Sequence, residues 1–428
     1  MNNYSGFYKG LGIDSHDENG FDAMSNVDTS SSLGTVRAQL DLVADNATIT
    51  ENGYQVQDKS GNLYLFSSTS GKTWKRDVGT GIVTLLNTNT NGAHVNVKFF
   101  NGNIYYVTTG NIGKLEVLTD TFTDSFHTFV NAADYHPMEE VNAILHIGDG
   151  KDIVSINALD AINDSALDLP PDYVCTALLN ENSYLLNGSK VGTTVYQARI
   201  FYWDTYSSSW TLEDDVQAIN FFIKVDNYTF VQAGTEGMIY NWDGNKAVKW
   251  KPLRGVTSDV SMQATTQLGD KALFAIGDTV YSLYQKSGSG GFAITPEYTA
   301  PATIQSIMAI GTVLFVSANS LLYTHDTDRA TATITTPITD NTFDYVEADY
   351  EAMNGGTLGL ETNINGSGWV TESNFVDDTT NNRYVLIGGV SYAGHVNYGQ
   401  VRVTINPSGA NSPTLKSIKV ESGNEPTA

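Results

Sequence analysis

The chain has 428 residues, which exceeds the usual size of one compact core, so one large repeat assembly plus a smaller domain is expected. Its 47 acidic and 23 basic residues give a formal net charge of −24, which favours solubility. A strongly negative surface also repels phosphate backbones, so nucleic-acid binding is not expected. No run approaches the ~18–20 apolar residues that cross a bilayer, so membrane insertion is not expected.

The first segment, residues 1–34, is rich in Ser, Asp, Asn and Gly and predicts an extended N-terminal arm. Within it, residues 14–20 (DSHDENG) resemble a calcium loop, but the spacing departs from the helix-loop-helix consensus and no helices flank it. A structural calcium ion therefore has no support, here or at the acidic loop 326–328, and no cofactor is expected. The opening residues lack the basic and apolar regions of a secretory signal, which indicates synthesis in the cytoplasm.

Three short patterns in the next stretch predict strands and hairpins. Residues 35–42 (TVRAQLDL) alternate like a strand, and we expect this strand to complete the last blade of a ring, since such closure removes free sheet edges. Residues 67–74 (SSTSGKTW) resemble the Asp-box turn of sialidases and related propellers, with Thr69 in place of the aspartate. The pair Asn101-Gly102 is the strongest hairpin signal in the chain.

A repeat organises the middle of the chain. An aromatic or apolar run closes on a polar turn at 201–204 (FYWD), 240–243 (YNWD), 281–284 (YSLY) and 323–326 (YTHD), with steps of 39, 41 and 42 residues. Four strands of about 5–6 residues with their turns fill about 40–45 residues, the size of one propeller blade. The sequence therefore predicts a β-propeller over 35–340. Seven blades fit best, although six or eight also suit the pattern.

The period ends near residue 340. The tail, 341–428, has strand-like runs at 343–346, 383–387, 400–405 and 414–420, which predict a small C-terminal antiparallel β-sandwich. The fold class is therefore all-β.

The expected inner strands of the ring carry little chemistry. Glycoside hydrolysis needs two carboxyl groups across the bond, and a sialidase-like site also needs arginines for the substrate carboxylate. The strands at 95–98, 174–177, 218–222, 262–266 and 306–309 contain neither acids nor arginine.

Acidic groups that could reach the mouth of the ring are few: Asp134, Glu139 and Glu140, for which a solvated strand end is the simpler interpretation. Enzymatic activity is therefore not expected. The seven histidines show no metal-binding spacing, and His146, flanked by Leu145 and Ile147, is expected to pack. The single cysteine, Cys175, lies in an apolar run and predicts a buried thiol outside any disulfide.

Four tryptophans, Trp203, Trp210, Trp242 and Trp250, recur at the expected blade hairpins. An exposed indole face can stack on a sugar ring while its N–H donates a hydrogen bond. These positions are therefore candidate glycan or partner contacts. The alternative is that the rings pack between blades.

Several stretches together resemble propeller proteins of tailed bacteriophage virions, which carry a propeller followed by a C-terminal β-sandwich. The resemblance is carried by 136–138 (HPM), 143–151 (AILHIGDGK), 167–170 (LDLP), 200–204 (IFYWD) with Trp210, and 413–420 (PTLKSIKV). It spans most of the chain, but its motifs are structural and assign no catalytic residue.

This resemblance implies a structural component of a phage virion, in the tail or an appendage, that docks other virion proteins without enzymatic activity. It also implies multiple symmetric copies in the particle after synthesis in the host cytoplasm. Two alternatives stay open: a module that binds a host-surface glycan or receptor, and a degenerate sialidase-like or glycosidase-like propeller.

Overall fold

The computed structural model describes residues 2–4, 21, 23–29, 35–192, 197–209, 212–253, 256–285, 291–338, 345–351, 353–364, 366–375, 382–386 and 399–421. Every helix or strand assigned in these residues is a β-strand, so the all-β class predicted from the sequence is confirmed. Many of the tight turns between strands place Asn, Asp or Gly at positive φ, which those residues adopt at low cost.

The chain divides into two compact units, which are described separately. One comprises residues Ala44–Asp278 and Ala300–Thr324, and the other comprises Met1–Val43, Thr279–Thr299 and His325–Ala428.

Four-stranded sheets recur along the chain, each built from consecutive antiparallel strands. Among the described residues, the first three are β6 (Gly53–Gln57), β7 (Leu63–Ser67), β8 (Lys72–Arg76) and β9 (Val83–Thr88); β10 (Asn96–Phe100), β11 (Asn103–Val107), β12 (Asn111–Glu116) and β13 (Thr121–Thr128); and β14 (Met138–Val141), β15 (Ile144–Asp149), β16 (Asp152–Ile156) and β17 (Ile162–Asp168). The next three are β18 (Tyr173–Glu181), β19 (Tyr184–Val191), β20 (Ala198–Trp203) and β21 (Leu212–Val216); β22 (Ile219–Val225), β23 (Tyr228–Ala233), β24 (Met238–Trp242) and β25 (Ala247–Pro252); and β26 (Thr265–Leu268), β27 (Lys271–Ile276), β28 (Thr279–Gln285) and β29 (Phe292–Thr299).

A further four-stranded sheet takes its last strand from the other end of the sequence. Its order is β30 (Ile304–Ile310), β31 (Val313–Ala318), β32 (Leu321–Arg329) and β5 (Leu40–Asn46). The N-terminal strand expected at 35–42 therefore lies in this sheet, but it begins at Leu40. The preceding strand, β4 (Arg37–Ala38), pairs instead with β3 (Val27–Asp28).

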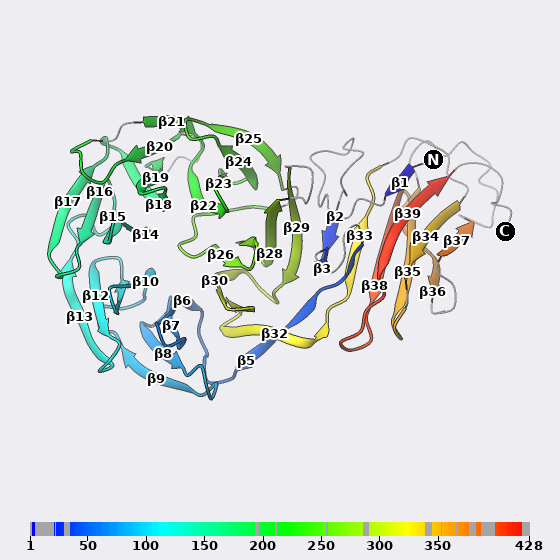
Figure 1. Cartoon of the computed structure of the whole chain (residues 1–428), viewed down its shortest axis with the longest axis horizontal. Coiled ribbons are helices and arrows are strands. Elements are labelled where there is room, and N and C mark those ends of the chain that lie inside the picture. The colour runs from blue at the N-terminus through cyan, green and yellow to red at the C-terminus, as the bar shows by residue number, and fades with distance from the viewer. Residues whose placement is uncertain are drawn as a thin grey trace. The chain divides into compact units, whose positions relative to one another are not determined.

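The first strands of these sheets contact one another in turn. β6 contacts β10, β10 contacts β14, and the series continues through β18, β22 and β26 to β30, which contacts β6 again. The sheets follow each other in chain order around a central axis (Figure 1). This arrangement is that of a β-propeller.

The hydrophobic core of this unit lies between neighbouring sheets. Phe66 of β7 stacks on Tyr106 of β11, with ring centroids 5.1 Å apart, in a cluster that joins the first two sheets. Similar clusters join the second sheet to the third, the third to the fourth and the fourth to the fifth. Aromatic residues of the repeat, such as Phe201 and Trp203, thus pack in the clusters between sheets.

The hairpin predicted at Asn101-Gly102 is present. Phe100 pairs with Asn103, and both loop residues have positive φ, as a tight two-residue hairpin turn requires.

The other unit contains a four-stranded sheet and a five-stranded sheet around one core. One is ordered β1 (Asn2–Tyr4), β39 (Leu415–Glu421), β34 (Tyr345–Tyr350) and β37 (Asn382–Leu386); the other is ordered β2 (Ala23–Ser25), β33 (Ala332–Thr335), β38 (Gly399–Asn406), β35 (Thr357–Ile364) and β36 (Trp369–Phe375). Buried residues of both sheets form a single cluster, which includes Val346, Ile418, Leu360 and Val403.

Two expected boundaries differ from the structure. The extended arm expected at 1–34 contributes β1, β2 and β3, and Met24 and Val27 are buried in the shared core of this unit. The strand β33 pairs with β38, so the C-terminal sheets begin before residue 340. In both places, isolated apolar residues inside polar segments form short strands because a neighbouring sheet supplies the partner.

Candidate functional site

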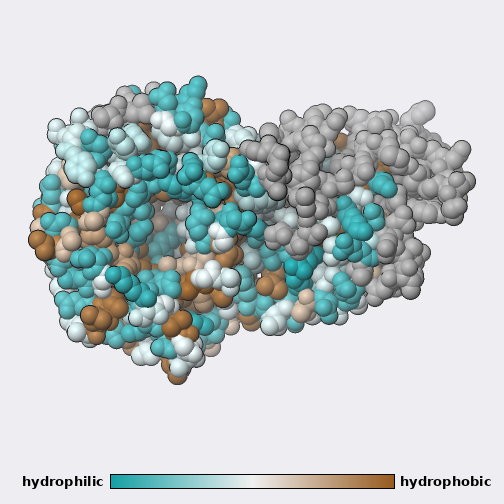
Figure 2. Space-filling model, viewed as in Figure 1, coloured by the Kyte–Doolittle hydropathy of each residue, from teal (hydrophilic) through white to brown (hydrophobic). Residues whose placement is uncertain are grey.

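The inner strands of the propeller unit enclose a cavity of about 400 Å³, which we call the axial cavity. Its lining comes from the first strand of each sheet and from the segment before β26: residues 55–57, 96–99, 137–139, 176–179, 221–222, 261–266 and 307–308. The unit is hollowed near its middle in the space-filling view (Figure 2). The strands expected to be innermost are thus those that line the cavity.

Polar side chains join the inner strands across the gaps between sheets. Thr176 Oγ1 donates to the Ile219 carbonyl at 2.6 Å, and Ser306 Oγ donates to the Gly53 carbonyl at 2.6 Å. Ladder hydrogen bonds satisfy only one edge of a first strand, so its other edge needs such partners. The polar residues of these strands therefore hold neighbouring sheets together.

One ion pair lies in the axial cavity. Lys98 Nζ of β10 lies 3.0 Å from Glu139 Oε2 of β14, and both side chains are partly exposed to the cavity. Among the described lining residues, Glu139 is the one acid and Lys98 the one base. Of the other acids considered from the sequence, Glu140 is exposed on β14 and Asp134 is exposed before it, and neither lines the cavity.

The side chain of Gln263 crosses part of the axial cavity. Its amide bonds to the backbone of Gln55 on β6, and its Nε2 also donates to the Val97 carbonyl on β10 at 3.1 Å. This role was not predicted from the sequence. The sequence offers one hint, a glutamine within an otherwise small and apolar inner run.

The candidate tryptophans are mostly not exposed. Trp203 and Trp242 are buried, with Trp203 Nε1 donating to the Ser207 carbonyl at 2.8 Å. Trp250 is half-buried against Phe230, with ring centroids 5.0 Å apart, and Trp210 lies outside the described residues. Trp203 and Trp242 thus pack in the clusters between sheets, which is the alternative that the sequence left open.

Two histidines are packed rather than placed at the axis. Burial lowers the pKa of His146 to about 4, and its ring meets Trp203 edge-on at 5.5 Å. The ring of His136 stacks on Phe129 at 4.0 Å and faces the Gly148 carbonyl at 2.7 Å. Burial also lowers the pKa of His136.

The thiol of Cys175 is free and fully buried. Burial raises its pKa far above the usual range, so the reactive thiolate is not formed at neutral pH.

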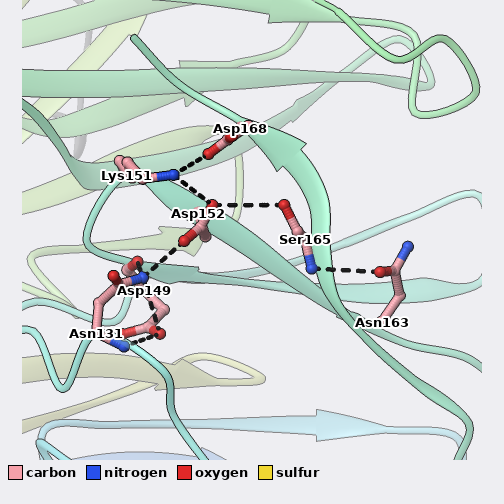
Figure 3. Close-up of polar contacts among 7 residues, drawn as sticks. All are labelled: Asn131, Asp149, Lys151, Asp152, Asn163, Ser165 and Asp168. Carbon is pink, nitrogen blue, oxygen red and sulfur yellow. Dashed lines mark hydrogen bonds and ion pairs between the residues drawn. The ribbon is translucent and has the colours of Figure 1, made fainter. Parts of the chain in front are cut away.

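Charged side chains gather at the β15–β16 hairpin (Figure 3). Lys151 Nζ bridges the carboxylates of Asp152 and Asp168, while the amide of Asn131 donates to Asp152 Oδ2 at 2.8 Å and its backbone N–H donates to Asp149 Oδ2 at 2.9 Å. The ammonium thus occupies the place among the acids where a cation would bind. We interpret the network as a clamp between the hairpin and the segment before β14.

Within the described residues, no group of three or more His, Cys, Asp or Glu side chains is arranged to hold a metal ion. Residues 326–328, expected to form an acidic loop, lie instead within β32, where Asp326 Oδ1 accepts from the Thr327 N–H at 2.6 Å. The loop at 14–20 lies outside the described residues. No helix in the described part of the chain has the length and apolar character of a membrane span.

Comparison with protein-family models gives no match, and comparison with curated proteins gives none either. Among solved structures, the chain is similar to a streptogramin B lyase, with a TM-score of 0.52 and 11% identity over 67% of this chain and 98% of that chain. It is also similar to a catalytically inactive virginiamycin B lyase from Staphylococcus aureus, solved with quinupristin. That match has a TM-score of 0.53 and 13% identity and covers 67% of this chain and 98% of that chain. The match to the WD40 repeats of RRP9 has a TM-score of 0.50 and 12% identity and covers 68% of this chain and 99% of that chain. At these identities the likeness defines the fold alone: this is an all-β protein with a β-propeller.

Proposed function

We propose that this chain is a structural component of a phage virion, located in the tail or an appendage, where it is a non-enzymatic docking platform for other virion proteins. In this proposal the sheets form a seven-bladed ring closed by β5, and the C-terminal sheets form a small β-sandwich. The circular contacts of the first strands and the core shared by the two C-terminal sheets support this description.

One recurring surface feature carries the docking role. The turns between the third and fourth strands of three successive sheets present Leu118, Leu159 and Tyr206, whose exposed fractions are 98%, 89% and 79%. We call these residues the turn tips. A single exposed apolar residue is ordinary, but recurrence at one structural position produces a row of anchors at the same end of neighbouring sheets.

The turns that carry the tips are held in place by neighbouring sheets. Lys75 Nζ of the first sheet pairs with Asp120 at 3.1 Å, and Lys114 Nζ of the second pairs with Asp160 at 2.8 Å. Rigid anchors lose little conformational entropy on binding, so they suit a docking surface.

Charge near the turn tips selects the kind of partner. Asp120 and Asp160 beside the tips are already paired with lysines, but Asp204 lies two residues from Tyr206 and the chain carries an excess of acid overall. A second copy would bring like charges together. The fitting partner is therefore a different virion protein with apolar pockets bordered by Lys or Arg.

The axial cavity supports the non-enzymatic part of the proposal. Its carboxylate, Glu139, is ion-paired with Lys98, so it acts as a structural group linking β10 and β14. The phage assignment itself is supported by the sequence resemblance at 136–138, 143–151 and 413–420.

The test is incorporation into particles of the phage that encodes the chain. A triple variant, Leu118→Ser, Leu159→Ser and Tyr206→Ser, should lower the copies per purified particle about tenfold or more, measured by quantitative mass spectrometry. The control is Val130→Ser, which removes a 70% exposed side chain from the connection at the other end of the sheets. Both proteins should unfold at the wild-type temperature. Absence of the wild-type chain from purified particles, or full incorporation of the triple variant, would refute the proposal.

Host-surface glycan binding is the second candidate function. One observation favours it, a groove between the fourth and fifth sheets whose described lining includes Tyr173 and the exposed Lys249.

A further inference from the structure

We propose that β9, the fourth strand of the first propeller sheet, pairs with the β9 strand of a second copy of this chain. The inference goes beyond the docking role and uses different residues. In its sheet β9 follows β8 and lies at the edge, on the rim of the ring (Figure 1). No strand in the described part of the chain pairs with its outer side. Such an edge is a template on which another strand can pair.

The composition of β9 sets it apart from the corresponding strands of the other sheets. Its residues, VTLLNT, include no charged residue and no proline. Proteins usually protect an edge strand with charges, with proline or with a covering segment. The fourth strands of the other described sheets of the ring each carry at least one acid or base, namely β13, β17, β21, β25, β29 and β5. Among these sheets, β9 alone lacks such a charge.

Exposed apolar side chains gather beside this edge. Val78 and Ile82, from the β8–β9 turn, and Leu85, from β9, are exposed by 54%, 63% and 49%. Singly exposed apolar residues are ordinary, but three between residues 78 and 85 form a patch at one place on the surface. A strand added to β9 would cover part of this patch as well as the open backbone edge.

The pairing with β8 shows which backbone groups of β9 are open. The Ile82 carbonyl accepts from the Asp77 N–H at 3.0 Å, so the backbone groups of Ile82 point toward β8. These groups alternate in direction along an antiparallel strand. The N–H and C=O groups of Val83 and Leu85 therefore point to the open edge, whereas those of Thr84 point toward β8.

The open groups are complementary to themselves under a two-fold rotation. When two β9 strands run antiparallel with the axis between their Thr84 residues, Val83 of each copy faces Leu85 of the other. Each of these two pairs exchanges two backbone hydrogen bonds, so every open group of Val83 and Leu85 gains a partner. Thr84 faces its own equivalent, a favourable cross-strand pair, and no like charges meet along the strand.

Local charge allows a second copy to be the partner, although the whole chain is acidic. Residues 44–94 contain four acids and four bases, whereas the chain contains 47 and 23. The bases of β8 are already paired with acids: Lys72 with Glu51 at 2.6 Å, Lys75 with Asp120 at 3.1 Å and Arg76 with Asp45 at 2.7 Å. Two copies therefore meet no net local repulsion at this sheet. Because the two strands occupy each other's edge, the association closes at two copies.

The experiment is analytical ultracentrifugation of the isolated full chain. A short edge contact should give a weak, reversible dimer, with a Kd on the order of 10–100 μM, so the chain is measured from about 1 to 300 μM. The expected result is a discrete species of twice the monomer mass at the upper end of this range. A monomer at every concentration, or growth beyond two copies, would overturn the proposal.

A charge exchange at Thr84 tests the register. Thr84→Lys places two ammonium groups opposite each other across the axis, and Thr84→Glu places two carboxylates there. Each variant alone should therefore dimerise about threefold or more weakly than wild type. An equimolar mixture brings a lysine opposite a glutamate and should dimerise about tenfold more tightly than either variant alone. Thr84 is exposed, so both variants should unfold at the wild-type temperature.

Thr123 on β13 provides the matched control. It is also an exposed threonine on a fourth strand, and it lies opposite Lys114 as Thr84 lies opposite Lys75. Thr123→Lys and Thr123→Glu should leave the dimer affinity unchanged, both alone and mixed. Equal weakening at Thr123, or no gain in the mixture of Thr84 variants, would show that β9 is not the interface. The result is separable from the docking test, because the chain is isolated and the turn tips are unaltered.

Discussion

The side-chain amide of Gln263 pairs with the backbone of Gln55 as a neighbouring strand would. Its Oε1 accepts from the Gln55 N–H at 2.6 Å, and its Nε2 donates to the Gln55 carbonyl at 2.9 Å. The two residues are separated by 208 positions in the sequence. One side chain thus satisfies backbone groups on the free edge of β6 that would otherwise face the axial cavity without a protein partner.

Replacing this amide should destabilise the propeller. Gln263→Leu keeps the approximate volume but removes the hydrogen bonds to Gln55 and Val97, so the free energy of unfolding should fall by about 2–3 kcal/mol in urea denaturation. Gln285→Leu, at an exposed position at the end of β28, should change it by less than about 0.5 kcal/mol. Equal losses in the two variants would show that the pairing with Gln55 contributes nothing specific.

The turn that resembles an Asp-box obtains its carboxylate from outside the motif. Glu51 accepts hydrogen bonds from Ser67 Oγ at 2.5 Å, from Ser70 Oγ and from Lys72 Nζ at 2.6 Å. Burial alone would raise the pKa of Glu51, but these three hydrogen bonds outweigh it and hold the pKa below its usual range. Thr69 can therefore stand where the aspartate is usual.

Glu51→Gln should lower the free energy of unfolding by about 1–2 kcal/mol at pH 7, because it removes a charged acceptor. A carboxyl whose pKa is lowered by folding stabilises the protein above its unfolded pKa of 4.5, and the contribution is lost as the pH falls through the folded value. The deficit of the variant should therefore shrink below about pH 4. Glu140→Gln, at an exposed carboxyl, is the control, and a deficit independent of pH would contradict this explanation.

The repeat made the all-β class and the propeller predictable, because each period contains enough alternating residues and turns for four strands. The axial position of strands such as 95–98 also followed from that period. The pairing of Gln263 with Gln55 did not, because it joins distant segments and leaves no local pattern.

Burial of the candidate rings was not fixed by position in the repeat. Trp203 and Trp242 follow an aromatic run at a hairpin, and that pattern suits an exposed ring as well as a packed one. Packing decides between the two, since the clusters between neighbouring sheets bury both rings. The groove at Tyr173 and Lys249 is lined by two different sheets, so the pattern of a single strand could not predict it either.

Stability should depend on pH through buried histidine. The pKa of His146 is lowered to about 4 by burial, and that of His94 is also about 4 for the same reason. The unfolded chain takes up these protons below about pH 6.5, whereas the folded chain resists until about pH 4. The free energy of unfolding should therefore fall as the pH drops through this window, by up to about 3 kcal/mol for each histidine.

His146→Phe should flatten part of this dependence, because the ring remains beside Trp203 but no longer titrates. At pH 7 the variant should lie within about 1 kcal/mol of wild type, since Nδ1 of His146 is buried with no hydrogen-bond partner in the described part of the chain. Urea denaturation at pH 7 and pH 4.5 measures both effects. Parallel profiles for the two proteins would exclude His146 as a source of the slope, which His94 would then have to supply.

The N-terminal segment should contribute to folding, because its short strands belong to the C-terminal unit. Val27 is fully buried and pairs with Ala38, so Val27→Ala should lower the free energy of unfolding of that unit by about 1–3 kcal/mol. Calorimetry is the suitable measurement, since a chain with two units is not expected to unfold in one step. Val370→Ala, at a half-exposed position on β36, should leave the transition within about 1 °C of wild type. An unchanged transition in Val27→Ala would instead favour an arm that lies on the surface and stabilises nothing within its own chain.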